Sequence, residues 1–117
     1  MSIKAASAPL PQVPSIMTAV ILNGNVRCQM EIDTGAAHCV ISYDMYKNLE
    51  AKSVRPLILD QGTVTMRMAD GTPSNAVIGM TRLSITRVEE PSKCGVFPVI
   101  VVKGPHALIG RSALSIL

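Results

Sequence analysis

The sequence predicts a small, mostly-β domain, either a barrel or a sandwich. Hydrophobic residues make up 48% of the 117 residues but aromatic residues only 3%, so aliphatic side chains and Met must fill the core, as suits a sheet. Short apolar runs alternate with turn signals along the chain. A chain of this length forms one core. Residues 1–14 hold three prolines and no apolar period, so we expect a flexible Pro-rich tail or linker there and a domain over 15–117.

The first expected element of the domain is a β-hairpin. Apolar runs predict strands over 16–22 and 26–32. Between them stands the dipeptide Asn23-Gly24, which is typical of a two-residue hairpin turn. The hairpin delivers Asp33 at the end of its second strand.

The middle of the chain is expected to hold a short strand, one helix and a long hairpin. The strand covers 39–41, and Ser42 then serves as the N-cap of a helix over 43–50. The stretch VRPLIL, residues 54–59, is a strand candidate. Residues 63–85 alternate in polarity around an Asp-Gly turn and predict a hairpin long enough to stand out as a flap.

The last third of the sequence predicts one long strand and a closing helix. Residues 93–104 form a near-continuous apolar run, which suggests a strand buried on both faces. Gly104-Pro105 then turns the chain into a short strand at 107–110. Residues 111–117 are expected to form one or two helical turns.

Charge and hydropathy exclude several function classes. The formal charge of +3 comes from scattered residues, and a nucleic-acid site would need a basic stripe with stacking aromatics. The apolar runs are too short to span a membrane, and no secretory leader is visible. We therefore expect an intracellular, cytoplasmic protein without nucleic-acid or membrane partners.

The cysteines favour reduced thiols over a metal site. Cys28, Cys39 and Cys94 are an odd number without CxxC spacing, so we expect buried thiols that act as small hydrophobic residues. The alternative is a metal site that combines Cys28 and Cys39 with His38 and His106. No pair of these ligands has finger-like spacing, so no metal is expected.

Two motifs together carry a resemblance to a known family. EIDTGAAHCVIS is followed about seventy residues later by HALIGRSAL, with a glycine-bearing hairpin between them. This combination resembles the retropepsins, the aspartic proteases of retroviruses and retrotransposons. The phrases YKNL and FPVIVVKGPHALIGR are especially similar to proteases of gypsy-type LTR retrotransposons. The resemblance covers roughly residues 16–117 and implies a small closed β-barrel with a flap hairpin and one or two short helices.

The resemblance also implies a mechanism, with Asp33 as the catalytic residue. Aspartic proteases add water to a peptide carbonyl with two carboxylates that share one proton. This sequence contains a single Asp-Thr/Ser-Gly triplet, so the second carboxylate must come from another copy across a two-fold axis. Thr34 and Gly35 would support the pair. The expected enzyme is a homodimer without a cofactor that cleaves an extended peptide, in a retroelement polyprotein or a host substrate.

Further roles follow from the same resemblance. The two structural residues are Gly110 and Arg111, of which the arginine would brace the active-site loop. The flap tip is assigned to residues 68–73, of which Met68, Ala69, Asp70, Gly71 and Thr72 would contact the substrate. The walls of the substrate pocket are assigned to Ala36, Ala37, Ile78 and Ile109.

The sequence departs from the family at three places, which keeps two alternatives open. Ala37 replaces an acid that often pairs with the motif arginine, Ser112 and Ala113 replace the usual residues after that arginine, and the given sequence stops before the C-terminal interface strand. One alternative is a non-catalytic dimerisation or peptide-binding module of the retropepsin fold within a larger protein. The other is an unrelated small β-barrel whose Asp-Thr-Gly is an Asx-turn that holds a loop.

Overall fold

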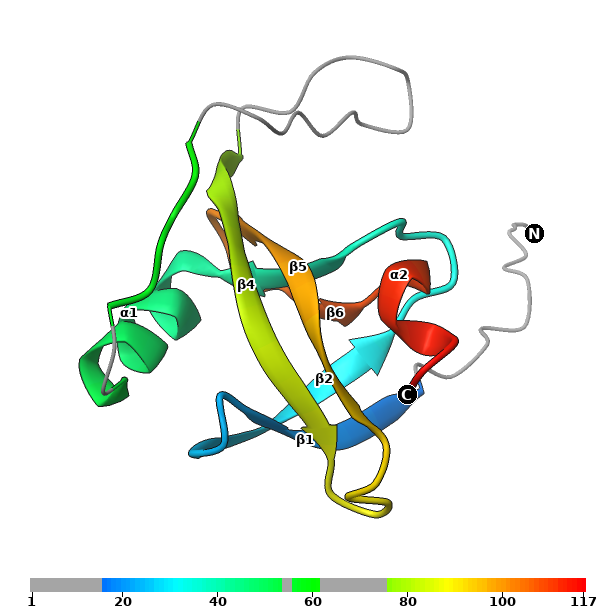
Figure 1. The fold of residues 1–117 in the computed structure, drawn as a ribbon. Helices are drawn as coiled ribbons and strands as arrows, with labels where there is room; N and C mark the ends of the chain where they lie inside the picture. The colour runs from blue at the N-terminus through cyan, green and yellow to red at the C-terminus, as the bar shows by residue number, and fades with distance from the viewer. Residues whose placement is uncertain (1–15, 54–55, 62–75) are drawn as a thin grey trace, which may run out of the picture.

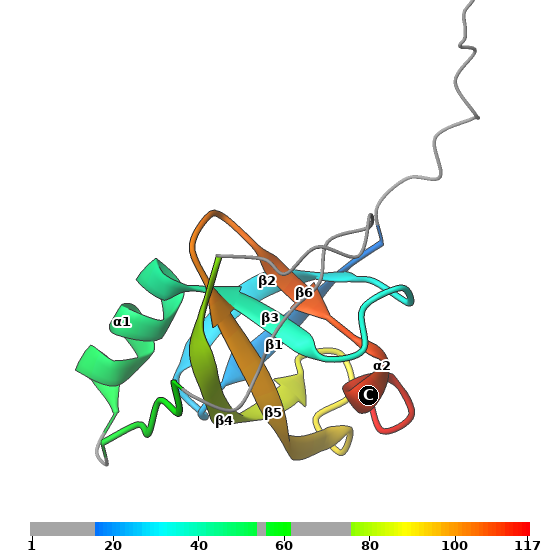
Figure 2. The ribbon, with the colours of Figure 1, turned by 90° about the horizontal axis from the view of Figure 1, so that it is seen from above.

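The chain folds into a closed barrel of six strands with two helices on opposite sides of it (Figures 1 and 2). This computed structural model describes residues 16–53, 56–61 and 76–117. The strand order around the barrel is β1-β2-β6-β3-β5-β4, and β4 closes onto β1. The predicted mostly-β barrel is confirmed. The elements are β1 (Met17–Leu22), β2 (Val26–Ile32), β3 (Cys39–Ser42), α1 (Tyr43–Lys52), β4 (Val77–Arg87), β5 (Cys94–Val102), β6 (Ala107–Ile109) and α2 (Arg111–Leu114).

The first hairpin forms where the sequence predicts it, with a loop one residue longer. Asn23 and Gly24 both have positive φ, 50° and 75°, the conformation for which this dipeptide is preferred. Leu22 pairs with Val26, so three residues form the loop instead of two. The third, Asn25, donates its N–H to the carbonyl oxygen of Leu22 at 3.2 Å, which closes the turn.

Two parallel pairings bring the distant motifs of the sequence together. Strand β2 pairs in parallel with β6, and Ile32 lies opposite Ile109. Strand β3 pairs in parallel with β5 and antiparallel with β6. The chain segments that leave β2 and β6 therefore start side by side, Asp33 from one strand and Gly110 from the other.

Aliphatic side chains that alternate along the strands fill the barrel. Val20, Leu22, Leu83 and Ile85 are at most 1% exposed and belong to the main core cluster, which also includes Phe97. This alternation is the expected signature of strands with one face inside. Aliphatic and Met side chains thus make most of the core, as the composition predicts.

A second, smaller apolar cluster lies outside the main core. Val40, Ile100 and Val102 form it, and Leu108 packs against it together with Val77. Strand β5 is buried on both faces only over its last four residues, whereas Cys94 and Val96 are exposed. Burial on both faces was expected for the whole strand and is wrong for its first half, because β3 pairs with β5 only from Val99 to Val102.

The two helices begin as predicted but end elsewhere. The side-chain oxygen of Ser42 accepts the N–H of Met45 at 3.1 Å, so Ser42 is the N-cap of α1 as expected. Helix α1 extends to Lys52, two residues beyond the predicted end. Helix α2 is a single turn from Arg111 to Leu114, followed by a turn closed by bonds to the carbonyl oxygen of Ala113.

Over residues 56–59, the described part of VRPLIL, the expected strand does not form, and residues 54–55 lie outside the described residues. Residues 56–59 have no ladder partner, and only Asp60 makes an isolated bridge, to Met80 of β4. Pro56 lacks an N–H, and the side chain of Ile58 is 81% exposed, so the apolar run did not signal burial here. Residues 1–14 and 62–75 lie outside the described residues, and with them the predicted tail, the first arm of the hairpin and the flap tip.

Within the described ranges, no helix is long and apolar enough to cross a membrane.

Candidate functional site

The candidate site is the loop that follows β2 and begins with Asp33. The N–H of Asp33 donates to the carbonyl oxygen of Ile109 at 3.0 Å, which continues the β2–β6 pairing by one residue. Its carboxylate oxygen Oδ1 accepts the N–H of Gly35 at 2.9 Å, and its carbonyl oxygen accepts the N–H of Ala36 at 3.2 Å. The backbone thus fixes the direction of the carboxylate.

The bond from Gly35 to the carboxylate is an Asx-turn, the geometry that the unrelated-barrel alternative required. A turn role and a catalytic role are compatible, because only one of the two carboxylate oxygens is engaged by this bond. Asp33 is half-buried, whereas Thr34 and Gly35 are exposed. The loop therefore presents its carboxylate at the surface of the barrel, where a second molecule has access to it.

Gly35 also meets a steric requirement of this turn. A Cβ atom at residue 35 would lie 3.2 Å from Oδ1 of Asp33, which is tighter than most real contacts. Its φ is not in the left-handed region, so the need for glycine here comes from the close approach of backbone and carboxylate.

Arg111 binds the loop through backbone carbonyl groups. Its Nη1 atom donates to the carbonyl oxygen of Thr34 at 3.1 Å and lies 3.5 Å from that of Gly35. This is a bracing contact of the kind expected for Arg111. It also explains how the arginine is accommodated beside Ala37, which offers no carboxylate.

The start of α2 holds the far side of the same loop. The N–H groups of Arg111 and Ser112 donate to the carbonyl oxygens of Ala36 and Ala37 at 2.8 and 3.0 Å. Gly110 is buried beneath this contact, and a Cβ atom there would lie 2.4 Å from the carbonyl oxygen of His38. Figure 1 shows α2 packed beside the loop that joins β2 to β3. Helix and loop therefore form one unit.

Sequence reasoning named His38 and Cys39, which lie directly behind the loop, but assigned them no part in supporting it. Cys39 is fully buried, and burial raises the pKa of its thiol, an effect that the neighbouring Gly110 backbone and Ser112 side chain partly offset. The Nδ1 atom of His38 is buried without a hydrogen-bond partner among the described residues. The expectation of buried thiols holds for Cys39, holds only in part for Cys28, which is half-buried, and is wrong for Cys94, which is exposed at the first residue of β5.

The four residues assigned to the pocket walls differ in their exposure to solvent. Ala36 and Ile78 are half-buried and Ala37 is exposed, so these three offer surface to a ligand. Ile109 differs, because it is 1% exposed and belongs to the main core. Its neighbour Leu108 faces the opposite side of β6, with the second apolar cluster. Because successive side chains point to opposite faces of a strand, the sequence alone could have shown that Leu108 and Ile109 face different sides of β6.

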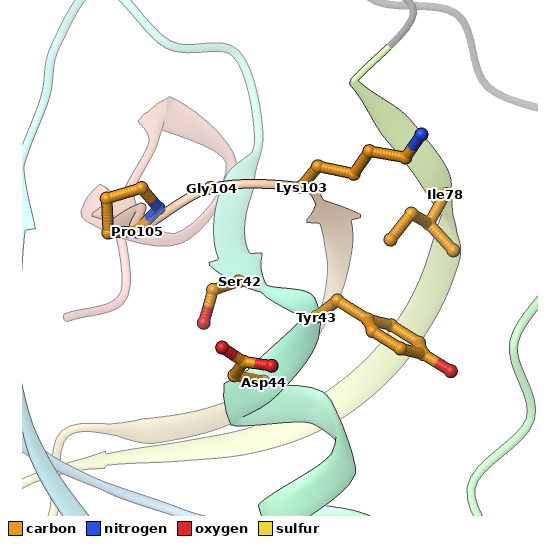
Figure 3. Close-up of a pocket in the computed structure, with 7 residues that line it drawn as sticks. All are labelled: Ser42, Tyr43, Asp44, Ile78, Lys103, Gly104 and Pro105. Atoms are coloured by element: carbon orange, nitrogen blue, oxygen red, sulfur yellow. The ribbon is translucent and has the colours of Figure 1, made fainter.

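A cavity of about 570 Å³ lies away from this loop, at the start of α1 (Figure 3). In Figure 3 the side chains of Lys103, Ile78 and Tyr43 gather on one side, and Ser42, Asp44 and Pro105 on the other. No residue from Asp33 to Ala37 lines it. Cavity size alone therefore does not identify the site suggested by the chemistry.

In the part of the chain that the structure describes, no three His, Cys, Asp or Glu side chains come together as a metal site would require.

Comparisons with known proteins agree with this geometry. The family model described as aspartyl protease matches residues 18–113, which include the Asp33 loop and the start of α2. Among solved structures, the EIAV protease complexed with the inhibitor HBY-793 is similar, with a TM-score of 0.67 and 21% sequence identity over 92% of each chain. This likeness supports the fold. No curated protein sequence matches the chain.

Proposed function

The chain belongs to the aspartyl protease family, and on this premise we propose that it is a homodimeric, retropepsin-like aspartic endopeptidase. The observation that carries the proposal is the Asp33 loop, which holds one carboxylate at the barrel surface by a bond from Gly35. The family chemistry requires two carboxylates, and the sequence has a single Asp-Thr/Ser-Gly triplet. One chain therefore supplies half of a site.

The second carboxylate is proposed to be Asp33 of another copy. Asp44 lies in the first turn of α1 and Asp60 in the bridge to β4, on elements other than the loop after β2. A two-fold axis beside Asp33 would place two identical loops against each other, as an isologous contact does. Thr34 is exposed next to Asp33 and in the proposed dimer would meet its own copy across that axis.

In the proposed reaction, water is the nucleophile. One Asp33 carboxylate accepts a proton from the water, and the protonated carboxyl of the other copy donates to the carbonyl oxygen of the scissile bond. Two like charges at close range resist ionising together, so the pair holds one proton at mildly acidic pH, where we expect maximal activity. The contacts of Gly35 and Arg111 keep each carboxylate oriented without moving a proton themselves.

The proposed substrate is an extended peptide with apolar residues around the cleaved bond. Leu108, beside Val40 and Ile100 in the second cluster, offers aliphatic surface one residue from the core position Ile109. This geometry favours Leu108 over Ile109 as a pocket residue. The phrase FPVIVVKGPHALIGR supports an origin related to gypsy-type retrotransposon proteases, with a polyprotein or a host protein as substrate.

A cleavage assay on a mixed peptide library tests the proposal. The unmodified chain is compared at matched high concentration and mildly acidic pH with Asp33→Asn and with Asp44→Asn, the same change at an exposed acid of α1. We expect cuts that Asp33→Asn abolishes and Asp44→Asn retains. Cuts that survive in Asp33→Asn contradict the proposal. A folded dimer that binds peptides but cuts none supports the non-catalytic module instead.

A further inference from the structure

The acid Glu31 of β2 lies beside the catalytic residue proposed above. Side chains alternate along β2, where Met30 is fully buried in the core and Glu31 is half-buried on the opposite face. The Asp33 amide continues the β2–β6 pairing by one residue, so residue 33 points to the same face as residue 31. Two residues of extended strand span roughly 7 Å. Each chain therefore holds a second carboxylate close to its proposed catalytic one.

The neighbours of Glu31 across the sheet are apolar. Its register partner on β1 is Met17, which is 50% exposed, and its partner on β6 is Leu108, the residue proposed above for the substrate pocket. Residues that lie opposite each other in a ladder share a face, so Glu31 borders the aliphatic surface that Leu108 forms with Val40. Packing does not explain an acid at this place, because neither neighbouring side chain can donate a hydrogen bond to it.

The carboxylate of Glu31 is also unpaired. Among the residues that the structure describes, no hydrogen bond or ion pair engages it. A half-buried carboxylate without a partner is a favourable place for a cationic group brought by a ligand, because a charge-assisted hydrogen bond then replaces the hydration that is lost. Lysine and arginine suit this place, since their methylene stems cover apolar surface while the charged end reaches the acid.

We propose that Glu31 is a specificity-determining residue, which selects substrates with a lysine or arginine next to the cleaved bond. The inference rests on the proposed function, because it takes the Asp33 loop as the site of cleavage. The stem of the basic side chain packs against Leu108, and its charged end pairs with Glu31. In a two-fold symmetric dimer each copy contributes one Glu31, so the basic residue is accepted either before or after the cleaved bond. The apolar preference proposed above then applies to the remaining positions.

The test compares peptides that differ at a single side chain. One peptide that the chain cuts is resynthesised with lysine, norleucine or glutamate at the residue before the cleaved bond, and again at the residue after it. Norleucine has the four-carbon stem of lysine without the ammonium group, so the lysine-to-norleucine ratio of kcat/KM isolates the charge. We expect the unmodified chain to prefer lysine by about fivefold, the scale of a partly exposed ion pair.

Three variants decide whether the charge of Glu31 is responsible. Glu31→Gln keeps the shape of the side chain and should bring the lysine-to-norleucine ratio to about one. Glu31→Lys should reverse the order, so that the glutamate peptide is cut faster than the lysine peptide, which a merely structural role of Glu31 would not produce. Glu50→Gln makes the same change at an exposed acid of α1 and should keep the preference for lysine.

Failure of the specificity and failure of the enzyme give different results. Cleavage that depends on Asp33 but shows no lysine preference, or a preference that Glu31→Gln leaves unchanged, overturns the inference and leaves the proposed protease intact. If no peptide is cut, fluorescence anisotropy measures how tightly labelled library peptides, with lysine or norleucine at one position, bind the Asp33→Asn chain. Tighter binding with lysine that is lost on adding Glu31→Gln supports the role of Glu31, and equal or absent binding overturns it.

Discussion

Replacement of Gly110 by alanine tests whether the packing of α2 fixes the active-site loop. Gly110 has φ −95°, which any residue adopts, so the effect is purely steric. The new Cβ atom would lie 2.4 Å from the carbonyl oxygen of His38 and 2.8 Å from that of Ala36. To restore a normal contact, the loop must move by roughly 0.6–1.0 Å, because the obstructing atoms belong to the backbone.

That movement disturbs the two hydrogen bonds between the amides of α2 and the loop, each of which contributes about 1 kcal/mol. Overpacking adds about 1–3 kcal/mol, so we expect Gly110→Ala to lower the free energy of unfolding by about 2–5 kcal/mol. The matching fall in Tm is about 8 °C or more.

Urea unfolding and thermal unfolding measure this loss directly, and peptide cleavage measures the displacement of Asp33. Gly95→Ala is the matched control, because its new Cβ atom meets only the far end of the Phe97 side chain, at 2.8 Å. Phe97 lies in the main core and its ring must repack, but a side chain moves aside more readily than backbone, so the control should lose less stability than Gly110→Ala. If Gly110→Ala unfolds and cleaves like the unmodified chain, the loop is not held by this contact.

Three further predictions follow from other contacts. Arg111→Leu removes the hydrogen bond to the loop carbonyl groups and should lower the rate of peptide cleavage about tenfold or more. The control Arg82→Leu replaces an exposed arginine of β4 and should leave the cleavage rate unchanged. Ser42→Ala should cost about 1 kcal/mol in urea unfolding through loss of the N-cap, and an unchanged midpoint would contradict the capping role. Burial raises the pKa of Cys39 and of Tyr46 above their ordinary values of 9.0 and 10.0, so at alkaline pH the folded state keeps protons that the unfolded state releases. The free energy of unfolding, measured in urea, should therefore fall as the pH rises above about 9. A free energy of unfolding that stays constant over this range would refute the linkage.

The elements that the sequence predicted well depend on local chemistry. Asn23-Gly24 sets its own turn by positive φ, and Ser42 caps its own helix by one bond to the first turn. Both signals can therefore be read locally, although Asn23 also exchanges hydrogen bonds with Ser84 of β4. Alternating aliphatic residues similarly led to a barrel or a sandwich, because inward and outward positions repeat along each strand, and the resemblance to the retropepsins favoured the closed barrel.

The features that the sequence could not predict depend on tertiary partners. Ile58 sits in an apolar run typical of a strand, yet the pairing around the barrel leaves it 81% exposed. The contacts of Arg111 with loop carbonyls are also invisible in the sequence, since any backbone oxygen is an acceptor.

The central claim, that each chain holds half of a catalytic site, is tested most directly by mixing the unmodified chain with Asp33→Asn. The two are unfolded together, refolded at a fixed total concentration and assayed for peptide cleavage. If one carboxylate comes from each copy, an equal mixture contains about one quarter fully active dimers and shows about one quarter of the original activity, because mixed dimers lack a carboxylate. A fall to about one half, in proportion to the unmodified chain, would mean that each chain works alone and would contradict the account.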